Sequence, residues 1–315
     1  MKTPELIVSA VPHVHGGNSI QKIMMNILIA LVPAMVIGVY FFGVDTIRVV
    51  VIAMASAVAW EAILQKIMGR PIAISNLSGA VSGLILAMLL PPTAPWWMIC
   101  TGTFVMILLG KEVYGGLGNN PFNGVLIAWV VLQMSYPDHM MYWVAPPGDF
   151  MTEATPLEVL KFEGVESIAE YFSTSGLLIG NTTGFIGEVS ALMLLIGGAY
   201  LLIRKVVSWR IPVSFLAGII LFSGLFWLTN SEEYASPLFH LLAGGSIMAA
   251  FFLATDMTSS PVTPAGMLIY GFLCGVLTVV IRLWGAWADG AYYAVFIISI
   301  LTPLLDKIKS KVYGR

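Results

Sequence analysis

Charged residues are scarce in this sequence: 10% of its 315 residues are Asp, Glu, Lys or Arg, whereas 58% are hydrophobic. A soluble domain has roughly 25% charged residues, so most of the surface of this protein does not face water. The mean hydropathy of +0.89 agrees with this. Apolar runs long enough to cross a ~30 Å hydrocarbon core recur along the whole chain. The net charge of −2 gives no reason to expect a nucleic acid as a partner.

Several motifs of soluble redox enzymes and ATPases are also missing. Cys100 and Cys274 lie in apolar runs, and two thiolates do not supply the four ligands that an iron–sulfur cluster normally takes. Among the histidines only His13 and His15 lie close together, so a haem or metal site built from histidines is not expected. Without a Walker motif or a dinucleotide fingerprint, the chain is not expected to be an ATPase or an NADH-binding subunit. The opening residues MKTPELIVSAVPHVHGG do not resemble a cleaved signal peptide.

Ten apolar segments predict an all-α polytopic membrane protein. They lie near residues 23–43, 47–68, 77–91, 96–110, 122–136, 185–203, 211–229, 237–255, 265–284 and 291–305. The third, fourth, fifth and tenth are short, so we expect broken or re-entrant helices among them. Such breaks are tolerated only where other parts of the protein cover the freed backbone groups.

The basic residues predict the orientation. With the N-terminus in the cytoplasm, the cytoplasmic ends of the segments hold twelve of the fifteen Lys and Arg residues, all except Arg48, Lys161 and Arg282. The positive-inside rule therefore favours an even number of spans, with both termini cytoplasmic. The long segment 137–184 then faces outward, and it is rich in acidic residues.

Five segments precede this outward segment and five follow it. Because five is odd, the second half enters the membrane from the opposite side, which predicts two inverted five-helix repeats. The stretches GAVSGLILAMLLPPTAP (79–95) and GGSIMAAFFLATDMTSSPVTPAG (244–266) both run from small residues into a Pro-broken turn. We therefore expect a first membrane repeat in 1–136, an extracytoplasmic loop in 137–184 and a second membrane repeat in 185–315. Small residues that merely allow close helix packing are the alternative explanation.

Two turns on the expected cytoplasmic side carry candidate site residues. Asp256 ends the eighth segment, where the carboxylate and the exposed carbonyls of a broken helix suit a small cation, although capping of the next turn by Asp256 and Thr258 is an equal alternative. The turn GKEVYGGLGNNPFNG (110–124) is rich in glycine, which permits close approach to a flat ligand. Asn120 and Pro121 also predict the start of the fifth helix.

Two acidic residues fall inside apolar segments, where they are functional candidates because burying a charge in a membrane is costly. Glu61 lies well inside the second segment, close enough to Lys66 and Arg70 to pair with them. Glu188 lies near the outer end of the sixth segment.

The outward segment contains the stretch PPGDFMTEATPLEVL. Thr155, followed by Pro156 and by Glu158 three residues later, is typical of a helix start with a capping box. This is the structural explanation for the stretch, and it requires nothing to be attached there.

A family resemblance covers essentially the whole chain. It depends on three stretches taken together: LIVSAVPHVHGGNSIQKIMMNILIALVPAMVIGVYFFG (6–43), GKEVYGGLGNNPFN (110–123) and FFLATDMTSSPVTPAGMLIYGFLCGVLTVVIR (251–282). In these the sequence resembles the RnfD component of the bacterial Rnf electron-transport complex, itself similar to the NqrB component of the sodium-pumping NADH:quinone oxidoreductase. The resemblance implies a bacterial inner-membrane component of a redox-driven pump for Na⁺ or H⁺, with electrons running between reduced ferredoxin and NAD.

The resemblance also implies two flavins. In that family an FMN is joined through its phosphate to a threonine of the outward loop, within a pattern close to D-x-x-[ST]-G-A-T that a flavin transferase recognises. Asp149, Thr152, Ala154 and Thr155 match this pattern, which makes Thr155 the implied attachment residue, whereas Glu153 stands where glycine is usual. A second, noncovalent flavin (riboflavin) is implied within the helical bundle. Its candidate neighbours, chosen by position, are Asn120, Asp256 and Thr258.

The implied partners are the other subunits of such a complex, including a second subunit with covalent FMN and two membrane subunits that resemble each other. The competing hypothesis is a flavin-free secondary transporter or channel for a small solute or ion. It explains the repeat, Asp256 and the broken segments equally well, but not the pattern from Asp149 to Thr155.

Overall fold

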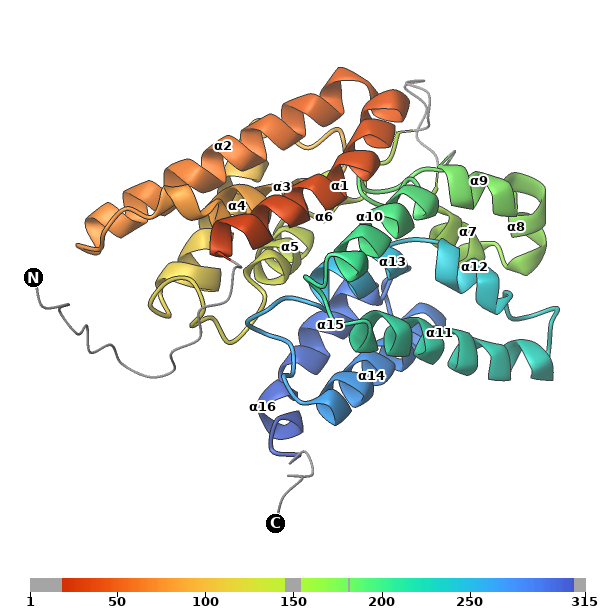
Figure 1. The fold of residues 1–315 in the computed structure, drawn as a ribbon. Helices are drawn as coiled ribbons and strands as arrows, with labels where there is room; N and C mark the ends of the chain where they lie inside the picture. The colour runs from red at the N-terminus through yellow and green to blue at the C-terminus, as the bar shows by residue number, and fades with distance from the viewer. Residues whose placement is uncertain (1–18, 145–153, 181, 309–315) are drawn as a thin grey trace, which may run out of the picture.

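The computed structural model describes residues 19–144, 154–180 and 182–308, and within these ranges all regular structure is helical (Figure 1). Four helices are long and apolar enough to cross a membrane: α1 (Ile20–Phe42), α2 (Val44–Ile67), α11 (Arg210–Thr229) and α14 (Pro264–Trp284). Each has at least 20 residues and is therefore about 30 Å long or longer. These helices confirm the first, second, seventh and ninth predicted segments.

The other predicted segments form shorter helices. Four of them have 11 to 13 residues and a length of about 17–20 Å: α3 (Ser78–Met88), α4 (Trp96–Ile107), α5 (Gly124–Ser135) and α10 (Ala191–Ile203). A π-helical turn, η2 (Leu108–Glu112), extends α4, and a 3₁₀ turn, η1 (Ile74–Asn76), precedes α3. α10 begins six residues later than the predicted segment 185–203.

The eighth and tenth segments are broken, as expected for the tenth. Residues of the eighth form α12 (Pro237–Leu242), α13 (Ser246–Met248) and a π-helical turn, η3 (Ala249–Leu253), and those of the tenth form α15 (Ala291–Ser299) and α16 (Thr302–Leu305). In the described ranges, then, continuous helices of membrane length are fewer than the ten predicted spans. The crossing number and the boundaries at 136 and 184 stay predictions.

Gly244 makes the break between α12 and α13. Its φ of 66° lies in the left-handed region that favours glycine. A Cβ at this position would also lie 2.5 Å from Leu157 Cδ1 and 2.7 Å from Asp289 Oδ2. The chain therefore changes direction here against two other segments, and a larger residue does not fit.

Four short helices connect the two sets of longer ones: α6 (Pro137–Met140), α7 (Pro156–Phe162), α8 (Val165–Tyr171) and α9 (Thr174–Ile179). Figure 1 shows α7, α8 and α9 gathered at one end of the molecule beside α12, whereas the start of α1 and α16 lie away from that end. Helices α1–α5 and α10–α16 form two groups, which meet where α1 packs along α10 and α5 contacts α15.

Candidate functional site

Thr155 is the N-cap residue of α7, and the predicted capping box is present. Thr155 Oγ1 accepts a hydrogen bond from the backbone N–H of Glu158 (3.3 Å), and Glu158 Oε2 accepts one from the backbone N–H of Thr155 (2.8 Å). Pro156 occupies the first helical position, where its missing N–H costs nothing. Of the other pattern residues, Ala154 is exposed, while Asp149, Thr152 and Glu153 lie outside the described residues.

Contacts on both sides hold α7 in place. Trp143 Nε1 donates to Glu158 Oε1 (3.1 Å), and Thr183 Oγ1 donates to the carbonyl of Ala154 (2.8 Å). From the end of α7, Lys161 Nζ donates to the carbonyls of Gly285 (2.5 Å) and Trp287 (2.8 Å), in the segment that follows α14. Desolvation by burial lowers the pKa of the Lys161 ammonium. The helix that Thr155 caps is thus tied to the connecting segments on either side of it and, through Lys161, to the group α10–α16.

Thr155 lies at the edge of a cavity of about 60 Å³, here called the Thr155 cavity. Aromatic side chains form much of its wall: Trp129, Trp143, Phe185, Trp287 and Tyr293. Their rings pack edge to face or stacked, with centroids 4.9 Å apart for Trp129 and Tyr293, 4.9 Å for Trp143 and Phe185, and 5.8 Å for Trp287 and Tyr293. Gln133, Glu188 and Asp289 add polar groups to the lining. The lining is therefore aromatic with a few polar groups, around a volume well below that of a site for a drug-sized ligand.

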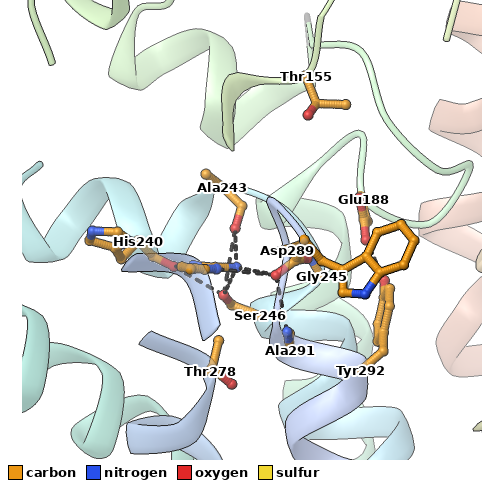
Figure 2. A network of polar contacts seen from close by, with 12 residues as sticks. Thr155, Glu188, His240, Ala243, Gly245, Ser246, Thr278, Asp289, Ala291 and Tyr292 are labelled. Atoms are coloured by element: carbon orange, nitrogen blue, oxygen red, sulfur yellow. Dashed lines mark hydrogen bonds and ion pairs between the residues drawn. The ribbon is translucent and has the colours of Figure 1, made fainter. Parts of the chain in front are cut away.

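Asp289, which lines this cavity, forms an ion pair with the buried Arg282, and Figure 2 shows the polar contacts around Asp289. Arg282, 4% exposed, donates through Nε and Nη2 to Asp289 Oδ1 at 3.1 and 2.9 Å. Its remaining donors bond to the carbonyls of His240 and Ala243 and to Ser246 Oγ, at 2.5, 3.0 and 2.8 Å. Every one of these partners belongs to the broken segment of α12 and α13. Arg282 therefore supplies hydrogen-bond donors to carbonyl groups that have lost their helical partners at the break between α12 and α13.

Asp289 and Glu188 both face the Thr155 cavity but have different surroundings. Asp289 Oδ2 accepts from the backbone N–H of Gly245 (2.7 Å), and Oδ1 accepts from that of Ala291 (3.1 Å), besides the bonds from Arg282. Glu188 Oε1 accepts a hydrogen bond from the hydroxyl of Tyr292 (2.6 Å). The sequence singled out Glu188, and it missed Arg282 and Asp289. Their charges inside or beside an apolar segment were the available signal.

A larger cavity of about 310 Å³, here called the Asn120 cavity, lies between the two groups of helices. Its wall includes residues of α1, α3, α5, α10, η2 and η3 and the turns that hold Asn120 and Asp256. Asn120 Nδ2 donates to Thr258 Oγ1 (2.7 Å), which donates to Asp256 Oδ2 (2.8 Å). The candidate residue Asn120 therefore lies beside the candidates Asp256 and Thr258 of a distant turn, at one cavity.

The predicted helix start at Asn120 is wrong. α5 begins at Gly124, and Asn123 is its N-cap, with Oδ1 accepting from the backbone N–H of Val125 (2.9 Å). Asn123 Nδ2 also donates to the carbonyl of Leu253 in η3 (3.3 Å). The contact with η3 favours Asn123 as the N-cap residue of α5. Asn120 lies before the helix and lines the Asn120 cavity.

The suggested pairing of Glu61 with Lys66 or Arg70 is also wrong. Glu61 Oε1 accepts from Lys111 Nζ (2.5 Å) and from Gln65 Nε2 (3.2 Å). Arg70 pairs instead with Glu112 (3.3 Å). Lys111 is 8% exposed and Glu61 only 1%, so the ion pair is buried. The π-helical turn η2 turns both of its charged residues inward, and sequence periodicity does not reveal such a turn.

No group of three or more His, Cys, Asp or Glu side chains in the described part of the chain is placed to hold a metal ion. Asp256 Oδ2 instead accepts hydrogen bonds from Thr258 Oγ1 and from the N–H and hydroxyl of Ser259. The contacts observed for Asp256 are those of the capping alternative. A role for it in an ion path stays a prediction.

The chain matches one protein family along nearly its whole length and is similar to relatives of known name. The model described as the NQR2, RnfD, RnfE family matches residues 7–314. The chain is 40% identical to the D component of the Na⁺-translocating ferredoxin:NAD⁺ oxidoreductase complex of Acetobacterium woodii, over 100% of this chain and 97% of that protein. It is 37% identical to the D component of the proton-translocating ferredoxin:NAD⁺ oxidoreductase complex of Clostridium ljungdahlii, over 97% and 95%. It is 36% identical to the D component of the ion-translocating oxidoreductase complex of Escherichia fergusonii, over 98% of each.

Proposed function

The chain belongs to the NQR2, RnfD, RnfE family, and from this premise we propose that it is an electron-carrying membrane subunit of an ion-translocating ferredoxin:NAD⁺ oxidoreductase complex. It works with the other subunits of that complex and does not catalyse the reaction alone. The observation that carries the proposal is the position of Thr155, a helix-capping threonine at the edge of an aromatic cavity.

The proposed role of Thr155 is to carry a covalent FMN through a phosphodiester bond. Esterification replaces the hydroxyl hydrogen and leaves oxygen lone pairs, and the capping bond from Glu158 N–H needs only a lone pair. The capping box is therefore compatible with a modified threonine. Permanent attachment suits a flavin on the outward side, where a reversibly bound one would be lost. Asp149, Thr152 and Ala154 are the residues proposed to be read by the flavin transferase.

A second, noncovalent flavin, riboflavin, is proposed to occupy the Asn120 cavity. The volume of about 310 Å³ and the mostly apolar wall support a ring system of this size. Asn120 and Thr258 offer amide and hydroxyl groups at that wall. Asp256 lies next to them and is the candidate for the path of the coupling ion, Na⁺ or H⁺. The relatives named above include one complex of each kind.

The proposed setting is the bacterial inner membrane, with about ten spans in two inverted repeats, cytoplasmic termini and residues 137–184 outside. Two observations support this arrangement. Four helices are long enough to cross a membrane, and α7–α9 lie at a different end of the molecule from α16. The proposed partners are the other subunits of the complex, including a second subunit with covalent FMN and two paired membrane subunits.

The experiment is coexpression with the flavin transferase, followed by denaturing electrophoresis and mass spectrometry of the peptide that contains Thr155. We expect a fluorescent band and the mass increment of FMN. Thr155→Val should abolish both, whereas Thr174→Val, at an exposed threonine of the same outward segment, should leave them unchanged. An unmodified wild-type peptide beside an active transferase would contradict the proposal and favour the flavin-free transporter or channel.

A further inference from the structure

Three buried polar atoms at the Thr155 cavity have no hydrogen-bond partner. They are Trp129 Nε1, Gln133 Oε1 and Tyr293 OH, three of the four such atoms in the described residues. Trp129 is only 3% exposed and Gln133 only 5%. Because an unpartnered buried polar group costs free energy, the cavity is expected to hold something that supplies the missing partners. A volume of about 60 Å³ leaves room for a small ion and a few waters.

Glu188 brings a charge without a counterion to the same cavity. The interior carboxylates of Glu61, Glu112 and Asp289 each form an ion pair with a Lys or Arg side chain. Glu188 belongs to none of the ion pairs found in the described residues, and its side-chain donor there is the hydroxyl of Tyr292. Because a charge taken out of water needs a partner, Glu188 requires a cation or a proton at this cavity.

The other two acids of the cavity wall are already stabilised. Asp289 is paired with Arg282, and Glu158 accepts hydrogen bonds from the backbone N–H of Thr155 and from Trp143. Glu188 is thus the acid of this wall that is left to bind a counterion. A single available carboxylate among neutral oxygens suits a monovalent cation, whereas Mg²⁺ and Ca²⁺ sites usually use more than one carboxylate.

The neutral groups favour a cation over a proton. The amide oxygen of Gln133 only accepts hydrogen bonds, and the phenol oxygen of Tyr293 has lone pairs, so both atoms are able to ligate a cation. Carboxylate, amide and hydroxyl oxygens are the ligands that hard cations prefer. A proton on Glu188 supplies a donor to one acceptor, whereas a cation is ligated by several oxygens at once. The indole N–H of Trp129 needs an acceptor, which a water beside the cation provides.

We infer that the Thr155 cavity binds a small monovalent cation of the Na⁺ type, with the Glu188 carboxylate, Gln133 Oε1 and Tyr293 OH as ligands and water completing the shell. This site is separate from Asp256, which lies at the wall of the Asn120 cavity, and it does not depend on a flavin at Thr155. Gln133 belongs to α5 and Tyr293 to α15. A cation bound here therefore links the two groups of helices.

The test measures thermal unfolding of the full-length, detergent-solubilised protein while choline chloride is replaced stepwise by NaCl at constant ionic strength. The unfolding temperature should rise with the Na⁺ concentration, because a ligand that binds only the folded state stabilises it. Glu188→Gln removes the charge and should abolish the rise. The matched control is Glu166→Gln, at an exposed acid of α8, which should keep it.

Two results would overturn the inference. No rise in the wild-type protein would mean that water fills the cavity and that Glu188 carries a proton. A rise that survives in Glu188→Gln but is lost in Asp256→Asn would place the cation at the Asn120 cavity instead.

Gln133→Leu provides a second test that does not depend on the folding of Glu188→Gln. Without Na⁺ this variant should unfold at or above the wild-type temperature, because it removes an unpartnered buried oxygen. With Na⁺ its rise should be smaller than that of the wild type, since a ligand is missing. An equal rise in both proteins would contradict the role of Gln133. Thr155→Val should keep the full response to Na⁺, so the failure of the flavin proposal and the failure of this one are distinguishable.

Discussion

At the scale of single residues, Arg282 is a buried cation that hydrogen-bonds to the broken α12–α13 segment. Its guanidinium neutralises Asp289 and donates to two carbonyls and a hydroxyl of the broken α12–α13 segment. Burying an ion pair costs desolvation free energy that offsets most of the attraction between the charges. The contribution of Arg282 to stability is therefore that it leaves neither the carboxylate nor the carbonyls without a partner. The residue thus makes the break in the helix tolerable.

Replacing Arg282 by Met should lower the free energy of unfolding by about 3 kcal/mol, since it leaves the partly buried Asp289 carboxylate without its cation and two carbonyls without their donor. Asp45→Asn is the control, because it breaks only the exposed Arg48–Asp45 pair, with side chains 44% and 61% accessible. An exposed pair contributes about 0–1 kcal/mol. Denaturant titration of the detergent-solubilised protein measures both. Equal losses in the two variants would contradict the account of the buried pair.

Tyr292 is the donor that holds Glu188 at the Thr155 cavity. Tyr292→Phe keeps the ring and removes the hydroxyl, so the partly buried carboxyl loses the hydrogen bond. The expected cost is about 1–3 kcal/mol of stability. Thermal unfolding of the variant and of Tyr171→Phe, at an exposed site, provides the comparison. A loss as small as that of the control would show that Glu188 finds another donor.

At the scale of elements, α3 lies so close to α2 that glycine is required at their contact. A Cβ on Gly79 would collide with Glu61 Oε2, and one on Gly83 would lie 2.7 Å from the carbonyl of Ala53. This close approach is what lets Ser78 at the start of α3 reach the buried pair, where its Oγ accepts from Lys111 Nζ (2.5 Å).

Gly79→Ala should therefore destabilise the protein by about 1–3 kcal/mol through overpacking. Gly224→Ala, in α11, is the matched control, because its nearest neighbour, Pro237 Cγ, is 3.6 Å from the added Cβ. Alanine in place of a helical glycine with room around it should stabilise by about 0.5–1 kcal/mol. Thermal unfolding of the two variants should shift in opposite directions, and a shift of the same sign would refute the packing argument.

Elements and sites differed in how far the sequence predicted them. The four long helices followed from continuous apolar runs, and the capping box of Thr155 followed from a motif of four adjacent residues. The N-cap of α5 was predicted at the wrong asparagine, because Asn123 is selected by a bond to η3, far away in sequence. The meeting of Trp129 with Tyr293 was not predictable either, since it depends on how α5 and α15 pack.

At the scale of the whole molecule, the two proposed flavins belong to two separate places, one at Thr155 and one in the Asn120 cavity. The family predicted from three sequence stretches is confirmed, since the family model spans residues 7–314. The Asn120 cavity is lined from both α1–α5 and α10–α16, whereas the modification proposed at Thr155 would depend on a local loop pattern. The two flavins should therefore be separable by mutation.

Asn120→Ala should reduce the acid-extractable, noncovalent flavin while leaving the fluorescent band at wild-type strength. Loss of one neutral hydrogen bond of about 0.5–1.5 kcal/mol corresponds to roughly twofold to tenfold weaker binding. Asn230→Ala, at an exposed asparagine after α11, is the control. Quantifying extracted and protein-bound flavin in the same sample checks the prediction. Simultaneous loss of both flavins would indicate a folding defect or a shared site.

The attachment of α7 has a mechanical consequence. Trp143 donates a hydrogen bond to Glu158 near the start of this helix, and Lys161 near its end donates to the segment after α14, so both ends of α7 are held. Movement of α7 away from the segment after α14 would have to break the two hydrogen bonds of Lys161. A helix held at both ends would keep the flavin proposed at Thr155 at a constant distance from the next electron carrier. Because electron tunnelling weakens steeply with distance, this rigidity would keep the transfer rate steady while ions move elsewhere in the complex.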